Sequence, residues 1–224
     1  MPGQKEYRGA QGCVRHRDGD QGMMTGYLIR HGRTPGNLDG RYVGKRTNEE
    51  LSPEGKEQCK NRVCPRADVI YTSPLRRCVQ TASLLYPDRD VITQELLSEC
   101  DFGIFEGKNY KELSGEPLYQ QWIDSRGTLP FPGGESREQF QTRCLQGFFF
   151  CLEHCMQNRY KTFAMVVHGG TIMSILDALV VPHREYFEWQ VKNLEGFKIQ
   201  IEEQQWIAGN RSIRTVRKEA DVWR

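Results

Sequence analysis

The sequence has no apolar run long enough to cross a membrane. The longest, from residue 172 to residue 181, contains a polar interruption and falls well short of the roughly 20 residues that a spanning helix needs. The sequence also has no excess of charge of one sign, because 31 basic side chains face 29 acidic ones and the formal net charge is +2. We therefore expect no binding to membranes or to nucleic acid, and any anionic ligand must be held by local groups.

The cysteines do not form a disulfide framework. The chain contains eight of them, but no Cys-x-x-Cys pair and no short cysteine-dense stretch. Residues 1–21 are polar and lack the apolar core of a secretory signal. Reduced thiols in the cytoplasm are therefore expected. Cys151, His154 and Cys155 share helical spacing, which favours a partly buried thiol face over a metal site.

The composition fits a single folded unit. Hydrophobic residues make up 38% of the sequence and charged residues 27%, proportions that are typical of a soluble globular protein. The length of 224 residues fits one domain, since domains typically contain roughly 50 to 250 residues. We predict a disordered N-terminal extension over residues 1–23, one domain over residues 24–206, and a C-terminal tail over residues 207–224.

Short apolar runs alternate with longer amphipathic ones from residue 26 onwards. This alternation predicts an α/β fold in which helices flank a mostly parallel sheet. The expected strands lie at residues 27–29, 69–72, 90–96 and 163–167, with an antiparallel edge strand at 197–202. Helices are expected at residues 53–63, 74–85 and 136–156, and another should follow residue 170. Ser52 before Pro53 is a helix start signal.

Two of the predicted strands end in a histidine followed by glycine. Arg30, His31 and Gly32 follow the first strand, and His168 and Gly169 follow the fourth. The carboxyl ends of parallel strands meet at one edge of a sheet, where α/β proteins bind ligands. A neutral imidazole is a good nucleophile towards phosphorus, and a guanidinium neutralises phosphoryl oxygens. A basic loop and a structural histidine remain the alternatives, but the pair favours a shared site.

A second arginine follows the second predicted strand. Ser73-Pro74-Leu75-Arg76-Arg77 leads into a helix at the same edge of the sheet. Arg77 can supply a second guanidinium, whereas Arg76 is expected at the surface. The alternative is that both arginines lie on a solvated helix face.

Four motifs in this order resemble the histidine phosphatase superfamily, in the branch that includes phosphoglycerate mutases. They are Arg30-His31-Gly32 with Asn37, the segment Ser73 to Arg77, the segment Leu97 to Gly103 that contains Glu99, and His168-Gly169-Gly170. The resemblance spans residue 27 to about residue 196. It implies a three-layer α/β/α sandwich of the phosphoglycerate mutase type.

The resemblance also implies a role for each matching residue. His31 would be the phosphorylated nucleophile, and Glu99 would protonate the leaving oxygen and then deprotonate the attacking water. The groups implied to surround the phosphoryl oxygens are Arg30, Arg77, His168, Asn37 and the backbone at Gly32 and Gly169. No metal or cofactor is implied. Glu99 must start protonated, which requires burial or the field of the substrate, and His168 can be held cationic beside phosphate.

The resemblance favours hydrolysis over a mutase reaction. Residues 131–136 are similar to a loop of small bacterial members that include α-ribazole phosphatases, and the stretch between Glu99 and His168 is short for a mutase. We therefore expect hydrolysis of small phosphate monoesters, with α-ribazole 5′-phosphate as one candidate. A phosphoglycerate mutase-type transferase and a non-catalytic phospho-ligand module remain alternatives. The sequence carries no signal for an oligomeric state.

Overall fold

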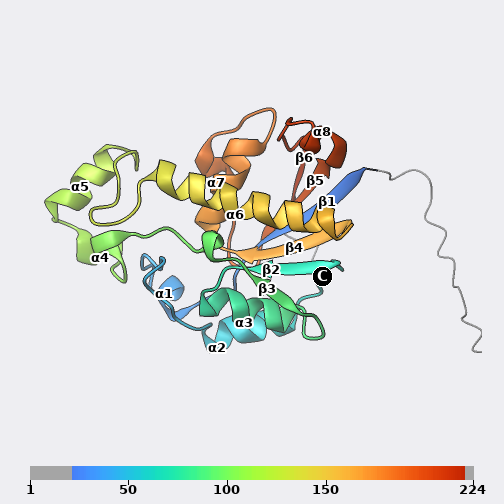
Figure 1. Ribbon diagram of the computed structural model, residues 1–224. Helices are drawn as coiled ribbons and strands as arrows, with labels where there is room; N and C mark the ends of the chain where they lie inside the picture. The colour runs from blue at the N-terminus through green and yellow to red at the C-terminus, as the bar shows by residue number, and fades with distance from the viewer. Residues whose placement is uncertain (1–21, 220–224) are drawn as a thin grey trace, which may run out of the picture.

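The computed structural model describes residues 22–219, and these form one sheet with helices on its faces (Figure 1). The strand order is β3-β2-β4-β1-β5-β6. Strands β1, β2, β3 and β4 run parallel to one another, while β5 is antiparallel to β1 and β6 is antiparallel to β5. The strands are β1 (Met23–Arg30), β2 (Val69–Thr72), β3 (Val91–Thr93), β4 (Thr162–Val167), β5 (Gly196–Glu202) and β6 (Thr215–Glu219). The predicted α/β/α fold with a mostly parallel sheet is therefore confirmed.

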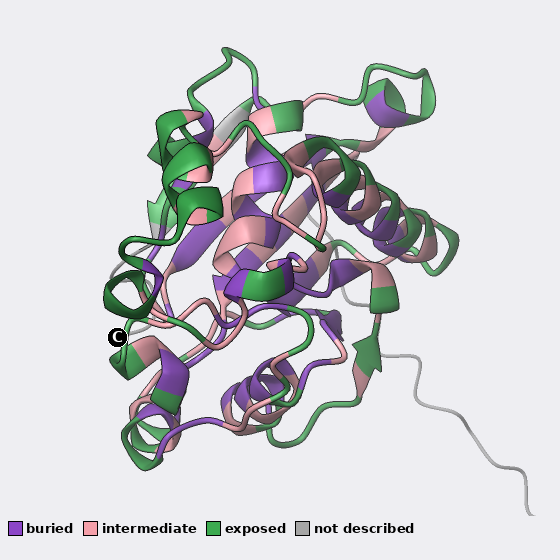
Figure 2. Ribbon diagram, turned by 90° about the vertical axis from the view of Figure 1, so that its left-hand side faces the viewer, coloured by how far each residue is buried: buried purple, intermediate pink, exposed green. Residues whose placement is uncertain are grey.

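Helices cover both faces of the parallel strands. Helices α2 (Pro53–Lys60) and α3 (Arg76–Leu85) lie on one side, and α6 (Arg137–Gln157) and α7 (Gly169–Leu179) on the other (Figure 1). Successive residues of a strand point to opposite faces, so Leu28 joins the α6–α7 core while Ile29 joins the α2–α3 core. Buried residues gather along the strands and on the helix faces packed against them (Figure 2).

Side-chain caps explain where two of the helices begin. The Ser52 hydroxyl accepts a hydrogen bond from the Gly55 amide, with Pro53 at the first helical position. The Ser136 hydroxyl accepts from the Gln139 amide, and the Gln139 side chain accepts from the Ser136 amide. Both predicted starts are confirmed, although α2 ends at Lys60 rather than residue 63.

A long segment between β3 and α6 lies beyond the carboxyl ends of the parallel strands, on the left of Figure 1. It contains short elements only. These are the 3₁₀ helices η1 (Glu95–Leu97) and η2 (Gly103–Phe105), followed by α4 (Tyr110–Leu113) and α5 (Pro117–Asp124). The remaining short elements of the chain are α1 (Pro35–Leu38), η3 (Tyr186–Trp189) and α8 (Glu203–Ile207).

The structure differs from the sequence prediction at β3. The predicted strand over residues 90–96 is wrong beyond Thr93, because the Gln94 side chain accepts a hydrogen bond from the Leu96 amide and turns the chain into η1. That turn brings the chain back over the sheet edge, towards Glu99.

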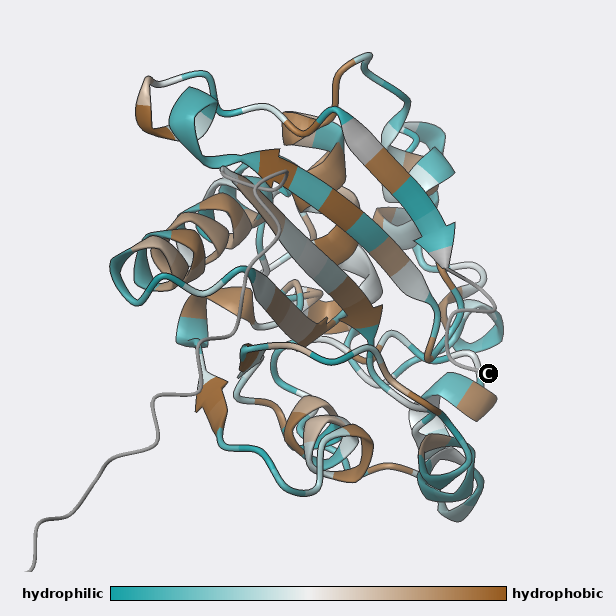
Figure 3. Cartoon of the chain, turned by 90° about the vertical axis from the view of Figure 1, so that its right-hand side faces the viewer, coloured by the Kyte–Doolittle hydropathy of each residue, from teal (hydrophilic) through white to brown (hydrophobic). Residues whose placement is uncertain are grey.

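The predicted C-terminal tail also differs. Residues Thr215–Glu219 form β6, which pairs with β5 in register from Gly196 to Gln200, so the antiparallel part of the sheet has two strands. Ile213 is fully buried just before β6, which anchors this segment. Along β5, hydrophobic and hydrophilic residues alternate (Figure 3), so one face packs on the core and the other carries Lys198 and Gln200. The predicted disordered extension over residues 1–23 is wrong at Met23, which begins β1, and its residues 1–21 lie outside the described residues.

Among the described residues, the helices are all too short or too polar to span a lipid bilayer.

Candidate active site

Hydrogen bonds between the ends of neighbouring strands bring His31 and His168, the two histidines predicted to share a site, close together. The His31 amide donates to the Val167 carbonyl at 2.9 Å, and the Ser73 amide donates to the Val166 carbonyl at 3.2 Å. The ends of β1, β2 and β4 therefore meet at one edge of the sheet, as the sequence predicts. The rings of His31 and His168 lie edge to face with their centroids 5.2 Å apart.

His31 is held as a neutral imidazole with a defined tautomer. Its side chain is buried, and its Nδ1 lies 2.7 Å from the Gly32 carbonyl oxygen. Because a carbonyl oxygen can only accept, Nδ1 carries the proton and Nε2 keeps its lone pair. Burial first, and then the charges of Arg77 and Arg30, lower the pKa of His31 well below its ordinary value. The lowered pKa favours the neutral imidazole, which is the form suited to act as a nucleophile.

The surroundings of His168 favour its neutral form over the cationic one. It is fully buried, and its Nε2 lies 2.8 Å from the Ser73 hydroxyl. Burial first, and then the charges of Arg77 and the neighbouring His31, lower the pKa of His168 well below its ordinary value. The sequence-based expectation of a cationic His168 assumed a bound phosphate, whose negative charge acts in the opposite direction.

Two arginines each keep a buried nitrogen that has no hydrogen-bond partner in the described structure. Arg77 is fully buried and uses Nη1 and Nη2 to donate to the carbonyls of Val43, Gly44 and Thr47 at 2.6 to 3.2 Å. Arg30 donates from Nη1 to a backbone carbonyl at 2.7 Å. The Nε atoms of both remain unpartnered. Buried N–H groups normally find an acceptor, so these two are suited to an anion.

Glu99 lies against the first turn of α7. Its Oε1 accepts from the Cys100 amide at 3.0 Å, and its Oε2 accepts from the Gly170 amide at 3.4 Å. Only 7% of the residue is exposed, and this burial raises the pKa of Glu99 even though the two amides and both arginines lower it. A carboxyl group with a raised pKa is suited to donate a proton, which is the role that the family resemblance implies for Glu99.

Gly32 differs from its predicted role in binding phosphate. Its amide already donates to the Thr81 hydroxyl at 2.9 Å, and its carbonyl accepts from His31. A Cβ at this position would lie 2.9 Å from Cys59 Sγ, so the glycine allows a close approach of α2. Gly32 orients His31 instead of presenting its amide to the ligand.

Asn37 lies beside the same loop, and part of its side chain is already engaged. Its Oδ1 accepts from the Thr34 amide and from Nδ2 of Asn193. Nδ2 of Asn193 also lies 3.0 Å from the His31 carbonyl oxygen, so this residue joins the two predicted ones. Gly169 begins α7, where the first amides have no acceptor within the helix.

Sequence reasoning missed Arg143, a residue of α6. It donates to the carbonyls of Leu96, Ser98 and Glu99 at 2.8 to 3.2 Å. It also forms an ion pair with Glu135 at 2.8 Å, so the Glu135 carboxylate is engaged within the protein. Arg143 is therefore a positioning residue for the segment that carries Glu99. Nothing in its sequence neighbourhood marks this role.

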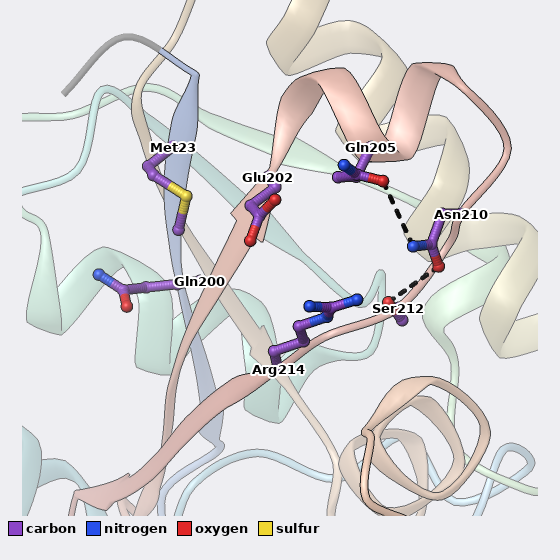
Figure 4. Close-up of a pocket in the computed structure, with 7 residues that line it drawn as sticks. All are labelled: Met23, Gln200, Glu202, Gln205, Asn210, Ser212 and Arg214. Atoms are coloured by element: carbon purple, nitrogen blue, oxygen red, sulfur yellow. Dashed lines mark hydrogen bonds between the residues drawn. The ribbon is translucent and has the colours of Figure 1, made fainter.

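Two features outside this site carry no candidate chemistry. Figure 4 shows a small pocket near the start of β1 and the end of β5, lined by Met23, Gln200, Glu202, Gln205, Asn210, Ser212 and Arg214. It contains none of the predicted site residues. The predicted thiol face of α6, with Cys151, His154 and Cys155, contacts the Tyr71 hydroxyl. This hydroxyl lies 2.7 Å from His154 Nδ1 and 3.3 Å from Cys155 Sγ.

Several known proteins are similar to this chain over much of its length. Phosphoserine phosphatase 1 of Hydrogenobacter thermophilus is 28% identical over 191 residues, which cover 81% of this chain and 88% of that protein. The 2,3-bisphosphoglycerate-dependent phosphoglycerate mutase 2 of Gloeobacter violaceus is 31% identical over 66% of this chain and 72% of its own. The crystal structure of the α-ribazole phosphatase from Shigella flexneri superimposes with a TM-score of 0.69 at 25% identity, covering 79% of this chain and 90% of that one. Residues 26–211 match the histidine phosphatase superfamily (branch 1), and this chain belongs to that family.

Proposed function

We propose that this protein hydrolyses small phosphate monoesters through a phosphohistidine on Nε2 of His31. The observation that carries the proposal is the neutral His31 with its lone pair on Nε2, beside two buried guanidinium nitrogens that lack a partner. A bound phosphoryl group supplies the acceptors that these nitrogens need. Membership of the family and relatives named as phosphatases support the same reaction.

In the first step, Nε2 of His31 attacks phosphorus and the bond from phosphorus to the substrate oxygen breaks. Glu99 transfers its proton to that oxygen, so the product leaves as an alcohol. Arg30 and Arg77 balance the charge on the phosphoryl oxygens, which is the main requirement of phosphoryl transfer.

In the second step, the carboxylate of Glu99 takes a proton from water, and the resulting oxygen nucleophile attacks phosphorus. The bond from phosphorus to Nε2 breaks, inorganic phosphate leaves, and both His31 and Glu99 return to their starting protonation states. The raised pKa of Glu99 suits it to both steps, because the group must exchange its proton within each cycle.

A mutase reaction is the second candidate, because one relative is named as a phosphoglycerate mutase. The two reactions share the phosphohistidine and differ in whether water or a second hydroxyl accepts the phosphoryl group. A role in binding alone is disfavoured by the buried Glu99, since a pure binding site has no need for a proton donor. The α-ribazole phosphatase neighbour supports α-ribazole 5′-phosphate as a candidate substrate.

The balanced net charge supports a small-molecule substrate rather than a nucleic acid. Free thiols at all seven cysteines of the described region support action in the cytoplasm.

The test is phosphate release from a panel of monoesters, measured in the presence of a chelator. The panel contains α-ribazole 5′-phosphate, phosphoserine, 3-phosphoglycerate and an aryl phosphate. We expect turnover by the wild type, loss of turnover in His31→Ala, and wild-type rates in the control His183→Ala, whose side chain is exposed. Turnover that survives in His31→Ala, or exchange between phosphoglycerate isomers faster than hydrolysis, would overturn the proposal.

A further inference from the structure

A second hollow adjoins the catalytic residues, and its walls are mainly aromatic. It spans about 750 Å³ of space including its open mouth, a size suited to a drug-sized ligand. Its aromatic side chains include Tyr42, Phe102, Trp122, Phe131, Phe140 and Phe187. Glu99 and Gly170 line this hollow and also a polar hollow that contains Arg30 and Gly169. Glu99 therefore lies between the proposed phosphate-binding groups and the aromatic hollow.

The aromatic walls are held by contacts among themselves. Trp122 stacks on Phe131 with the ring centroids 4.8 Å apart and the planes 29° from parallel. Phe102 meets the same Phe131 edge to face at 4.9 Å, and Tyr42 meets Phe102 at 5.3 Å. These residues come from the segment before α2 and from the long segment before α6. The hollow is thus preformed, which lowers the entropy lost on binding.

Charged groups are scarce in this hollow. Apart from Glu99, the charged residue in the lining is Arg137. Its guanidinium lies 3.9 Å from the centroid of the Tyr186 ring and 3.9 Å from a carboxylate oxygen of Asp177. A small polar alcohol such as serine or glycerate would place its own charges against apolar walls. Charges that lose water without gaining a partner bind poorly.

We propose that the preferred substrates are phosphate monoesters whose alcohol carries a large, flat, apolar group that fills the aromatic hollow. This inference rests on the proposed function, because it places the phosphoryl group at His31 and the leaving oxygen beside Glu99. The walls then bind the remainder of the alcohol by apolar burial and ring stacking. Phosphoserine and phosphoglycerates are correspondingly poor substrates of this protein.

The first experiment compares 2-(1-naphthyl)ethyl phosphate with ethyl phosphate. Both are esters of primary alcohols, so the comparison isolates the apolar group from the reactivity of the leaving oxygen. Burial of about 100 Å² of ring surface at roughly 25 cal/mol per Å² predicts a kcat/KM about 70-fold higher for the naphthyl ester. Equal kcat/KM values for the two esters would overturn the inference while leaving the proposed function intact.

Two variants test whether the aromatic hollow causes the preference for the naphthyl ester. Trp122→Ala removes one wall, and the ratio of the two kcat/KM values should fall by about tenfold. The control Phe150→Ala removes an aromatic ring that is 59% exposed on α6 and does not line the hollow, so the ratio should stay at the wild-type value. A ratio that is unchanged in Trp122→Ala contradicts the assignment of the hollow.

Binding of phosphonates tests the aromatic hollow independently of the proposed phosphatase activity. We would measure Kd by calorimetry for ethylphosphonate and 2-(1-naphthyl)ethylphosphonate, which need no turnover. At least tenfold tighter binding of the naphthyl compound supports the hollow as a site for apolar groups, even if no ester is hydrolysed and the proposed function fails. Equal Kd values overturn the inference whatever the hydrolysis assay shows.

Discussion

Replacement of Arg143 by alanine tests how the fold positions Glu99. The Arg143 guanidinium joins three backbone carbonyls of residues 96, 98 and 99 to the carboxylate of Glu135. In the alanine variant those carbonyls lose their donor and Glu135 loses its ion pair. The segment that carries Glu99 is then free to shift relative to α7.

The expected loss of stability follows from the burial of this network. The side chains of Arg143 and Glu135 are only 14% and 19% exposed, so water cannot fully replace the missing donor. Removing one partner of this partly buried ion pair, with the lost carbonyl bonds included, costs about 3 kcal/mol, the low end of the range for fully buried pairs. For a chain of this size, such a change corresponds to a fall in Tm of roughly 10 °C.

The activity assay distinguishes a positioning role from a purely structural one. With an alkyl phosphate, whose leaving oxygen needs a proton, we expect kcat/KM, which reports on transfer to His31 and not on the later attack of water, to fall by about 100-fold in Arg143→Ala. With p-nitrophenyl phosphate, whose leaving group needs little protonation, the fall should be less than about tenfold. Rates are measured well below the Tm of the variant. Arg143→Lys keeps the charge without the planar fork, and should recover part of the stability.

The control is Arg66→Ala, which removes an exposed arginine far from this network in the sequence. Its Tm and both rates should match the wild type. If Arg143→Ala lowers the Tm but reduces the kcat/KM values of the two substrates equally, the network supports the fold without orienting Glu99 as the proton donor, and its positioning role is refuted.

The same site and its surroundings lead to three further predictions. In a pH profile of kcat/KM, activity should be lost on the alkaline side as Glu99 deprotonates, at a pH above the ordinary pKa of glutamate, because burial raises the pKa of Glu99. On the acid side it should be lost only below the ordinary pKa of histidine, because burial lowers the pKa of His31. The profile of Glu99→Gln should lack the alkaline limb and keep the acid one. Gly32→Ala should destabilise the protein by about 1–3 kcal/mol in a denaturant titration, because the new Cβ meets Cys59 Sγ, and Cys59→Ala in the same chain should restore part of that loss. The pKa of Glu135 is lowered because hydrogen bonds from Arg143 and the Asp101 amide outweigh the effect of its burial. The ionised Glu135 therefore stabilises the fold fully above the ordinary pKa of glutamate, and this stabilisation is lost as the pH falls through the lowered pKa. In Glu135→Gln, a plot of Tm against pH should lack the part of the acid-side decline that this loss causes in the wild type.

Local sequence signals determined the elements that bring the candidate catalytic groups together. The caps at Ser52 and Ser136 act within one helical turn, and each can be recognised from four consecutive residues. His31 and His168 follow apolar strands directly, and parallel pairing forces such strand ends to meet. The proximity of the two histidines could therefore be predicted from the order of residues along the chain.

Only the tertiary structure revealed how these groups are held and what surrounds them. Arg143 is 47 residues from Leu96 in the sequence and Asn193 is 162 residues from His31, yet each contacts its partner through a hydrogen bond. The aromatic hollow likewise combines Tyr42 with Trp122 and residues of α6 and α7. The fixed tautomer of His31 and the true role of Gly32 also depend on neighbours that folding supplies. Helix caps and strand patterns are encoded by adjacent residues, whereas burial and long-range hydrogen bonds exist only once distant segments pack together.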